Sequence, residues 1–150
     1  MQPEFRLANP TDFDTLMEFM RQFYAIDQYP FDEQAARTTL EKIVGDPSLG
    51  RAWLINHEDE AIGYLAVTFG YSLEYHGRDA FIDELFVTTN YRNHGVGTKA
   101  IEFVLEMCPE LGIHALHLEV ERTNTAGQAL YRKFGFENHD RYLMTRWISS

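Results

Sequence analysis

The 150-residue chain has a single cysteine, Cys108, so it cannot form an internal disulfide. A lone cysteine is typical of a protein from a reducing compartment. No apolar run approaches the roughly 20 residues that a membrane-spanning helix needs. The opening "MQPEFRLANP" also lacks the basic start and apolar run of a signal peptide. We therefore expect a cytoplasmic protein with no membrane partner.

Basic residues are scarce as well, because 13 lysines and arginines stand against 23 aspartates and glutamates, a net charge of −10. A nucleic-acid-binding domain normally carries a basic face, so this balance argues against a nucleic-acid partner. No repeat, low-complexity segment or linker-like stretch divides the chain. Its length and its 45% hydrophobic content predict one domain, residues 1–150, with a core of its own.

Hydrophobic periodicity predicts a mixed α/β fold with the element order βααβββαβαβ. Strands are expected at residues 4–8, 51–56, 61–71, 80–87, 115–121 and 140–149, and helices at 9–27, 32–44, 95–108 and 124–134. The connection from strand 80–87 to strand 115–121 contains a helix. A crossover of that length predicts two parallel strands joined right-handedly.

The segment "YRNHGVGTKA", residues 91–100, places Gly95 and Gly97 two apart at the start of a predicted helix, with Arg92 three residues earlier. Glycines allow a backbone to approach an anion, and the free N–H groups of a helix N-terminus attract negative charge. This part of the chain carries positive charge and no acid. The pattern predicts a loop that binds pyrophosphate.

Two other interpretations of the glycines stay open. Gly95-x-Gly97-x-x-Ala100 also fits the dinucleotide-binding pattern, with Glu119 near the expected distance downstream, which would make the protein an oxidoreductase. Seven residues separate the predicted strand from Gly95, whereas the dinucleotide turn is tight. In the remaining interpretation the glycines only begin a helix.

Two longer stretches carry a resemblance to a known family. "DELFVTTNYRNHGVGTKAI" and "LEVERTNTAGQALYRKFGF" resemble, in this order and at this separation, motifs A and B of the GNAT superfamily of N-acetyltransferases. The resemblance implies the GNAT acyl-CoA N-acyltransferase fold, a mostly antiparallel twisted sheet with one parallel pair, 80–87 and 115–121, flanked by about four helices. It also implies acetyl-CoA as the cofactor and an amine as the acetyl acceptor.

The resemblance further implies which residues contact the cofactor. Main-chain groups near Phe86 and Val87 would bind the pantetheine arm, and Asn124 would contact the cofactor from the last helix. The pyrophosphate would lie in a loop made of Arg92, Asn93, His94, Gly95, Val96, Gly97 and Thr98. Many relatives have glycine in place of Asn93, but asparagine tolerates a left-handed backbone better than most residues.

Acetylation of an amine requires a neutral amine, a hydrogen-bond donor for the thioester carbonyl and a proton for the leaving thiolate. Tyr131 lies seven residues after Asn124, so the two side chains share one helix face. In relatives the tyrosine at this place protonates the departing sulfur, and we expect the same role for Tyr131. Asn124 is also expected to cap this helix.

The general base remains open among three carboxylates in otherwise apolar strands, Asp83, Glu84 and Glu119, and a water relay. Ionised groups in a central strand are costly unless they are paired or used. Some relatives that acetylate protein N-termini have their base where Glu119 stands, and polyamine and diamine acetyltransferases have an acidic pair at Asp83 and Glu84. Strand alternation predicts that Asp83 and Glu84 point to opposite faces.

A metal site is not expected. His117, Glu119 and Glu121 alternate onto one strand face, but consecutive positions on one strand make a poor zinc cage, and this chemistry requires no metal.

Aromatic and acidic residues are expected around the acceptor. The candidates are Asp27, Tyr29, Phe31, Tyr71, Glu74, Asp83 and Glu84. Such a lining suits a small cationic amine, polyamine-like or an amino-group metabolite. A protein N-terminus or lysine, an aminoglycoside-like drug, and a catalytically silent acyl-CoA sensor are the alternatives. The apolar "YLMTRWI" near the end could also join two copies into a homodimer.

Overall fold

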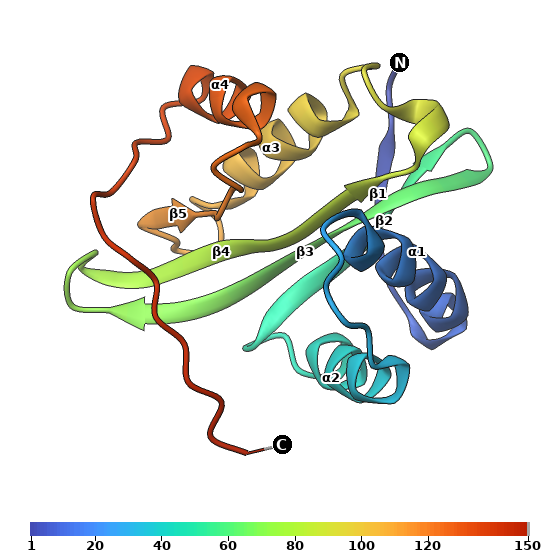
Figure 1. The fold of residues 1–150 in the computed structure, drawn as a ribbon, viewed down its shortest axis with the longest axis horizontal. Helices are drawn as coiled ribbons and strands as arrows, with labels where there is room; N and C mark the ends of the chain where they lie inside the picture. The colour runs from blue at the N-terminus through green and yellow to red at the C-terminus, as the bar shows by residue number, and fades with distance from the viewer. Residues whose placement is uncertain (150) are drawn as a thin grey trace. The chain divides into compact units, whose positions relative to one another are not determined.

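A computed structural model describes residues 1–149 (Figure 1). The chain divides into two compact units, Met1–Glu119 and Val120–Ser150. The single domain expected from the sequence therefore stays a prediction. Within residues 1–149, no helix combines the length and the apolar character that crossing a membrane requires.

The first unit is built on a five-stranded sheet with the order β1-β2-β3-β4-β5. The strands are β1 (Glu4–Leu7), β2 (Gly50–His57), β3 (Glu60–Ser72), β4 (Gly77–Val87) and β5 (Ala115–His117). The first three pairings are antiparallel, and β4 and β5 are parallel. The mixed sheet and the place of its one parallel pair confirm the prediction, because a helix-containing crossover returns the chain in the same direction.

Three helices cover this sheet. They are α1 (Phe13–Ile26), which follows the short 3-10 turn η1 (Pro10–Asp12), α2 (Glu33–Gly45) and α3 (Val96–Met107). In Figure 1, α1 and α2 lie on one side of the sheet and α3 lies on the other. The second unit contains α4 (Thr125–Lys133).

Strand alternation supplies both faces of the sheet with buried side chains. On one face Ala52, Leu54, Tyr64 and Phe86 pack with apolar residues of α1 and α2. We call this the α1/α2 face. Strand pairing places Trp53, Ile55, Leu65, Val67 and Ile82 on the opposite face, where they are buried and where the Trp53 ring packs against Phe103 of α3.

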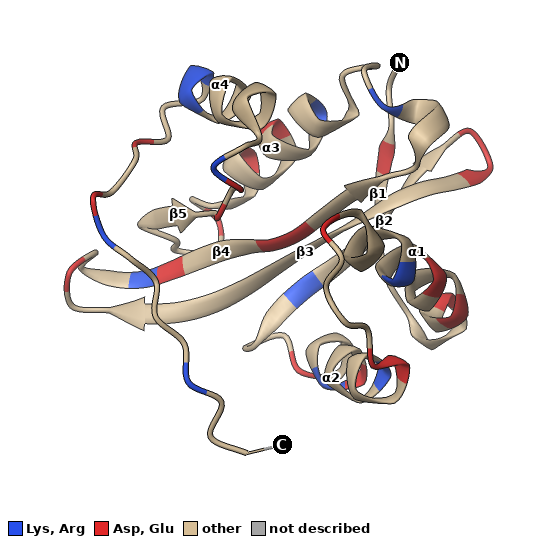
Figure 2. Ribbon diagram, viewed as in Figure 1, with Lys and Arg blue, Asp and Glu red and all other residues tan. Residues whose placement is uncertain are grey.

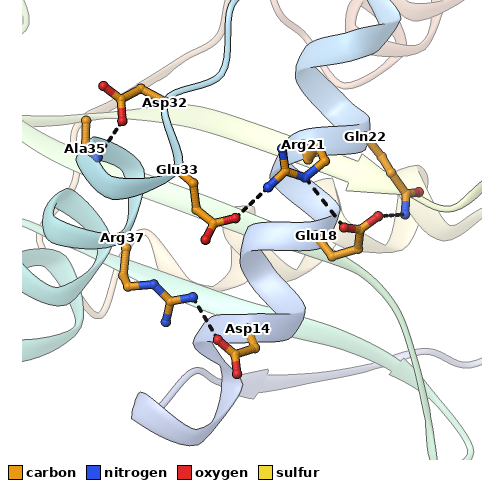
Figure 3. A network of polar contacts seen from close by, with 8 residues as sticks. All are labelled: Asp14, Glu18, Arg21, Gln22, Asp32, Glu33, Ala35 and Arg37. Carbon is orange, nitrogen blue, oxygen red and sulfur yellow. Dashed lines mark hydrogen bonds and ion pairs between the residues drawn. The ribbon is translucent and has the colours of Figure 1, made fainter.

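Two ion pairs connect α1 to α2 (Figure 3). Arg21 contacts Glu33 at 2.5 Å, and Arg37 contacts Asp14 at 2.7 Å. Exposed pairs of this kind contribute little stability each, on the order of 0–1 kcal/mol. They bridge the two helices on either side of the short connection, residues 27–32.

Two strand predictions need correction. The strand expected at 140–149 is wrong, because residues 136–149 contain no helix or strand. An apolar pattern makes a strand only where a neighbouring strand completes the hydrogen bonds, and no strand of the described residues pairs with this segment. Strand 115–121 is also shorter than expected, since β5 ends at His117 and Glu119 lies beyond it.

Candidate active site

The loop between β4 and α3 has the backbone geometry of an anion site. Asn93 and Gly95 both adopt left-handed conformations, with φ of 64° and 82°. Gly95 precedes the first residue of α3, and no side chain caps the N–H groups of the first turn. Uncapped amides at a helix N-terminus, approached through left-handed residues, form a typical cradle for phosphate oxygens. The residues present therefore fit the diphosphate of a coenzyme A thioester.

The strand that leads into this loop leaves main-chain groups available. β5 pairs with β4 only from Asp79 to Phe81, so no described strand pairs with that edge of β4 over residues 82–87. An open strand edge can take an extended ligand through main-chain hydrogen bonds. The Val87 carbonyl is already engaged, since Arg92 Nε donates to it at 2.9 Å.

Arg92 itself folds back onto the strand. Its guanidinium lies 5.7 Å from the centre of the Phe86 ring, and its backbone carbonyl contacts His94 Nδ1 at 2.8 Å. Phe86 is buried in the core, whereas Arg92 and His94 are exposed. The side chain of Val96, at the end of the loop, is only 2% exposed, so it holds the loop against the core.

Charge is divided sharply between this loop and the strand before it (Figure 2). Thr88–Ala100 contains Arg92 and Lys99 and no acid. The middle of β4 carries the adjacent carboxylates Asp83 and Glu84, drawn in red. An anionic ligand is therefore favoured at the loop and a cationic one at the strand.

A β-bulge in β4 sets the positions of the two carboxylates. Glu84 pairs with Ala66 and Ile82 pairs with Val67, so Asp83 has no partner on β3. The strict alternation that predicted opposite faces for Asp83 and Glu84 therefore does not apply. An unpaired extra residue re-aims the side chains beside it, and bulges are frequent next to active sites.

Two tyrosines hold the Glu84 carboxylate. Tyr24 Oη donates to one oxygen at 2.5 Å, and Tyr64 Oη donates to the other at 2.8 Å. Burial raises the pKa of Glu84, although both phenols act in the opposite direction. Burial, followed by the nearby carboxylate, also raises the pKa of both tyrosines, so the phenols remain donors at neutral pH.

Asp83 differs from Glu84 in having no hydrogen-bond partner among the residues that the structure describes. Its side chain reaches solvent, yet the surrounding protein atoms raise the pKa of its carboxyl by desolvation. Its charge also raises the pKa of Glu84, which puts the two groups in one electrostatic cluster. Asp83 is thus a carboxylate with free oxygens and a pKa shifted towards neutrality, which suits a general base.

Tyr131 and Asn124 belong to the second unit. Asn124 caps α4 as predicted, since its side chain accepts a hydrogen bond from the Gly127 N–H at 2.9 Å. Tyr131 is half-buried, its ring centre lies 6.1 Å from that of Phe136, and burial raises the pKa of its phenol. The phenol is therefore protonated at neutral pH.

The remaining predicted residues lie at several places. Glu119 is exposed at the end of the first unit. In the α1–α2 connection Asp27 and Tyr29 are exposed, while Phe31 is half-buried, with its ring centre 5.4 Å from that of Tyr24. Tyr71 and Glu74 lie at the β3–β4 hairpin, on the far side of the bulge from Glu84, and Tyr71 is 86% exposed.

Sequence reasoning missed Tyr24 and Tyr64. Both look like core aromatics in helical and strand patterns, and only their hydroxyl groups indicate otherwise. A buried tyrosine hydroxyl usually has a hydrogen-bond partner. The signal available in the sequence was the predicted carboxylate Glu84, which could serve as that partner.

Comparison with known proteins agrees with these features. Residues 14–136 match the model of the acetyltransferase (GNAT) family. The chain is 26% identical over 145 residues to the D-amino-acid N-acetyltransferase HPA3 of Saccharomyces cerevisiae, covering 94% of this chain and 88% of that protein. It is 31% identical over 77 residues to a thialysine N-epsilon-acetyltransferase of Bos taurus, covering 51% of this chain and 45% of that protein.

Among solved structures, an integron cassette protein from the mobile metagenome of Cole Harbour salt marsh superposes with a TM-score of 0.85 at 33% identity. The match covers 97% of this chain and 91% of that one. The family match spans most of the chain, including the glycine loop and α4. The chain therefore belongs to the acetyltransferase (GNAT) family and is an acetyl-CoA-dependent N-acetyltransferase.

Proposed function

We propose that the protein transfers acetyl from acetyl-CoA to the primary amine of a small cationic molecule, by direct attack in a ternary complex. The observation that carries the proposal is the pair of carboxylates at the β4 bulge, one free and one held by two phenols. Carboxylates beside aromatic rings attract a protonated amine. The names of two relatives, acetyltransferases of D-amino acids and of thialysine, also point to small amines.

In this proposal Glu84 binds the amine of the acceptor, and Asp83 removes its proton. The phenols of Tyr24 and Tyr64 occupy two of the roughly four lone-pair positions of the Glu84 carboxylate, and the others can accept from an ammonium group. The Asp83 carboxylate takes the proton that the amine must lose before its nitrogen can attack. Its raised pKa makes it a better proton acceptor near neutral pH than an ordinary aspartate.

The cofactor residues have separate tasks. The amides at the start of α3 and the left-handed residues Asn93 and Gly95 hold the diphosphate, and the open edge of β4 takes the pantetheine arm. The new C–N bond forms as the C–S bond breaks, and the thiolate leaves with a proton. We assign that proton to the Tyr131 phenol, following the resemblance of its helix to motif B.

A panel of amines tests the proposal. Release of free thiol from acetyl-CoA is measured over small mono- and diamines, amino acids, a lysine peptide and a peptide with a free N-terminus. We expect turnover above background hydrolysis only with the small cationic amines, and a large loss with Tyr131→Phe. Turnover with peptides alone would contradict the small-molecule assignment.

A second measurement covers the catalytically silent alternative. If the protein binds coenzyme A in a thermal-shift assay but acetylates none of the panel, the sensor interpretation replaces the enzymatic one. The same assay with NAD serves as the control for the dinucleotide interpretation of the glycine loop.

A further inference from the structure

We infer that Asp79 and His117 form a second acceptor subsite, which binds a second nitrogen of a linear diamine or polyamine while its terminal amine lies at Asp83 and Glu84. The inference rests on the proposed small-amine acceptor and extends it. It depends on three features: a built polar pair, its place on the face that carries Glu84, and a free hydrogen-bond acceptor.

The polar pair is held on several sides. Asp79 is 9% exposed, and His117 Nε2 lies 3.0 Å from its Oδ2. The imidazole packs between two aromatic rings, with centres 4.5 Å from Tyr75 and 4.9 Å from Phe81. Opposite Asp79 on β3 stands Gly70, where a Cβ would come within 2.7 Å of Asp79 Oδ1. A glycine therefore makes room for this carboxylate.

The strand register places the pair on the same face as Glu84. Their β3 partners are Gly70 for Asp79, Thr68 for Phe81 and Ala66 for Glu84. These partners are two residues apart, so they share one face of β3, and directly paired residues share that face as well. Tyr64, which binds Glu84, continues the same series.

The spacing suits a linear ligand. Ala66 and Gly70 are four residues apart on β3, so Glu84 and Asp79 stand about 13 Å apart along the strand direction. Between them Phe81 is 41% exposed and offers apolar surface for a methylene chain. The face thus has a carboxylate at each end and an aromatic ring in the middle.

The free acceptor is His117 Nδ1. Because a carboxylate oxygen only accepts hydrogen bonds, the bond to Asp79 assigns the hydrogen of the neutral ring to Nε2. Nδ1 then carries a lone pair, and it has no hydrogen-bond partner in residues 1–149. With the ring in this neutral form, the pair carries one negative charge, that of the Asp79 carboxylate. A lone pair beside a net negative charge and aromatic rings suits an N–H donor that is cationic.

A purely structural role is the competing explanation, because the pair lies where β5 ends its contact with β4. Buried polar pairs contribute little net stability, however, and apolar residues would hold two strands together as well. The two explanations differ in their effect on substrate preference.

The test compares linear α,ω-diamines of increasing chain length with monoamines of the same length. For the wild-type protein we expect kcat/KM to favour the diamine about tenfold once its two nitrogens span the site, as a hydrogen bond to a charged group implies. His117→Gln keeps an amide N–H for Asp79 but lacks Nδ1, and Asp79→Asn removes the charge. Both should abolish the diamine advantage and leave monoamine kcat/KM unchanged.

His114→Gln, at an exposed histidine just before β5, is the matched control and should keep the advantage. The inference is overturned if the wild-type protein acetylates both series equally at every length, or if His117→Gln and Asp79→Asn lower both series by the same factor. Monoamine turnover in either case leaves the acetyltransferase proposal standing. If neither series is acetylated, the proposed acceptor class itself is wrong.

Discussion

The proposed cofactor loop and the proposed acceptor face, the part of β4 that carries Asp83 and Glu84, would recognise their ligands by different means. From Thr88 to Ala100 the structure offers main-chain amides and backbone conformations, with no acidic side chain. On β4, only a few residues away, it offers two adjacent carboxylates, of which Glu84 is fixed by two tyrosine hydroxyl groups. Main-chain recognition depends on which backbone angles a residue permits, whereas side-chain recognition depends on individual atoms.

The comparison explains why the two regions respond differently to substitution. In the loop a residue can change with little effect if it tolerates the same φ and ψ. On the acceptor face even an isosteric exchange removes a charge or a donor. Four substitutions test this difference.

Asp83→Asn should lower kcat/KM for the acceptor by about 10²- to 10⁴-fold, the usual contribution of a positioned general base. A base works only when deprotonated, so wild-type kcat/KM should fall as the pH drops through the raised pKa of Asp83. That acidic limb should disappear in the variant. Glu119→Gln is the competing test, and a larger loss there would move the base to Glu119.

Gly95→Val should weaken coenzyme A binding about tenfold in a calorimetric titration. A β-branched residue at φ of 82° is strained by on the order of 1–2 kcal/mol, and the loop can relax only by abandoning its shape. Nothing lies within 4 Å of a Cβ built at this position, so crowding is not the cause. Gly95→Asn is the matched control, because asparagine tolerates left-handed angles, and equal weakening by both variants would contradict the backbone argument.

Glu84→Gln should raise the acceptor KM several-fold while raising Tm at neutral pH by on the order of 1–3 °C. Burial raises the pKa of this carboxyl above its ordinary value of 4.5, so the charged form opposes folding. Stability is then highest below the unfolded pKa and is lost as the pH rises through the folded one. The gain in Tm should vanish below about pH 4, and a gain that persists there would have another origin.

Tyr91→Phe should change coenzyme A affinity less than threefold. Its hydroxyl donates to Glu60 at 2.6 Å and ties the loop to the start of β3, but the contact is exposed, and such contacts contribute little. The calorimetric titration with coenzyme A measures this change in affinity. A loss as large as that of Gly95→Val would mean that side-chain ties, and not backbone conformation, hold the loop.

Sequence patterns were sufficient for the loop and for most of the fold. The helical and strand periods of the first unit gave the elements and the parallel crossover, because burial on known faces produces them directly. Gly95 and Asn93 are residue types that favour left-handed backbone conformations, and both adopt them. The segment 140–149 shows the limit, since an apolar pattern cannot say whether a partner strand is present.

The acceptor face could be predicted only in part. Asp83 and Glu84 stood out as carboxylates in an apolar strand. The bulge at Asp83 depends on the pairing of β4 with β3, and the tyrosines that hold Glu84 lie 20 and 60 residues away in sequence. Asp79 and His117, 38 residues apart, meet only because β4 and β5 run parallel. Local sequence patterns do not determine how segments so far apart in the sequence pair with one another.

The bulge also bears on how this chemistry could be lost. Because Asp83 lacks an opposite residue on β3, its removal would leave Ile82 and Glu84 facing Val67 and Ala66, which are already neighbours. The ladder would close without a frame shift, and the diphosphate cradle would be untouched. Under the proposed mechanism, a single codon deletion would leave a protein that binds acyl thioesters without transferring the acyl group, because the proposed base is the residue that the sheet does not need for its pairing.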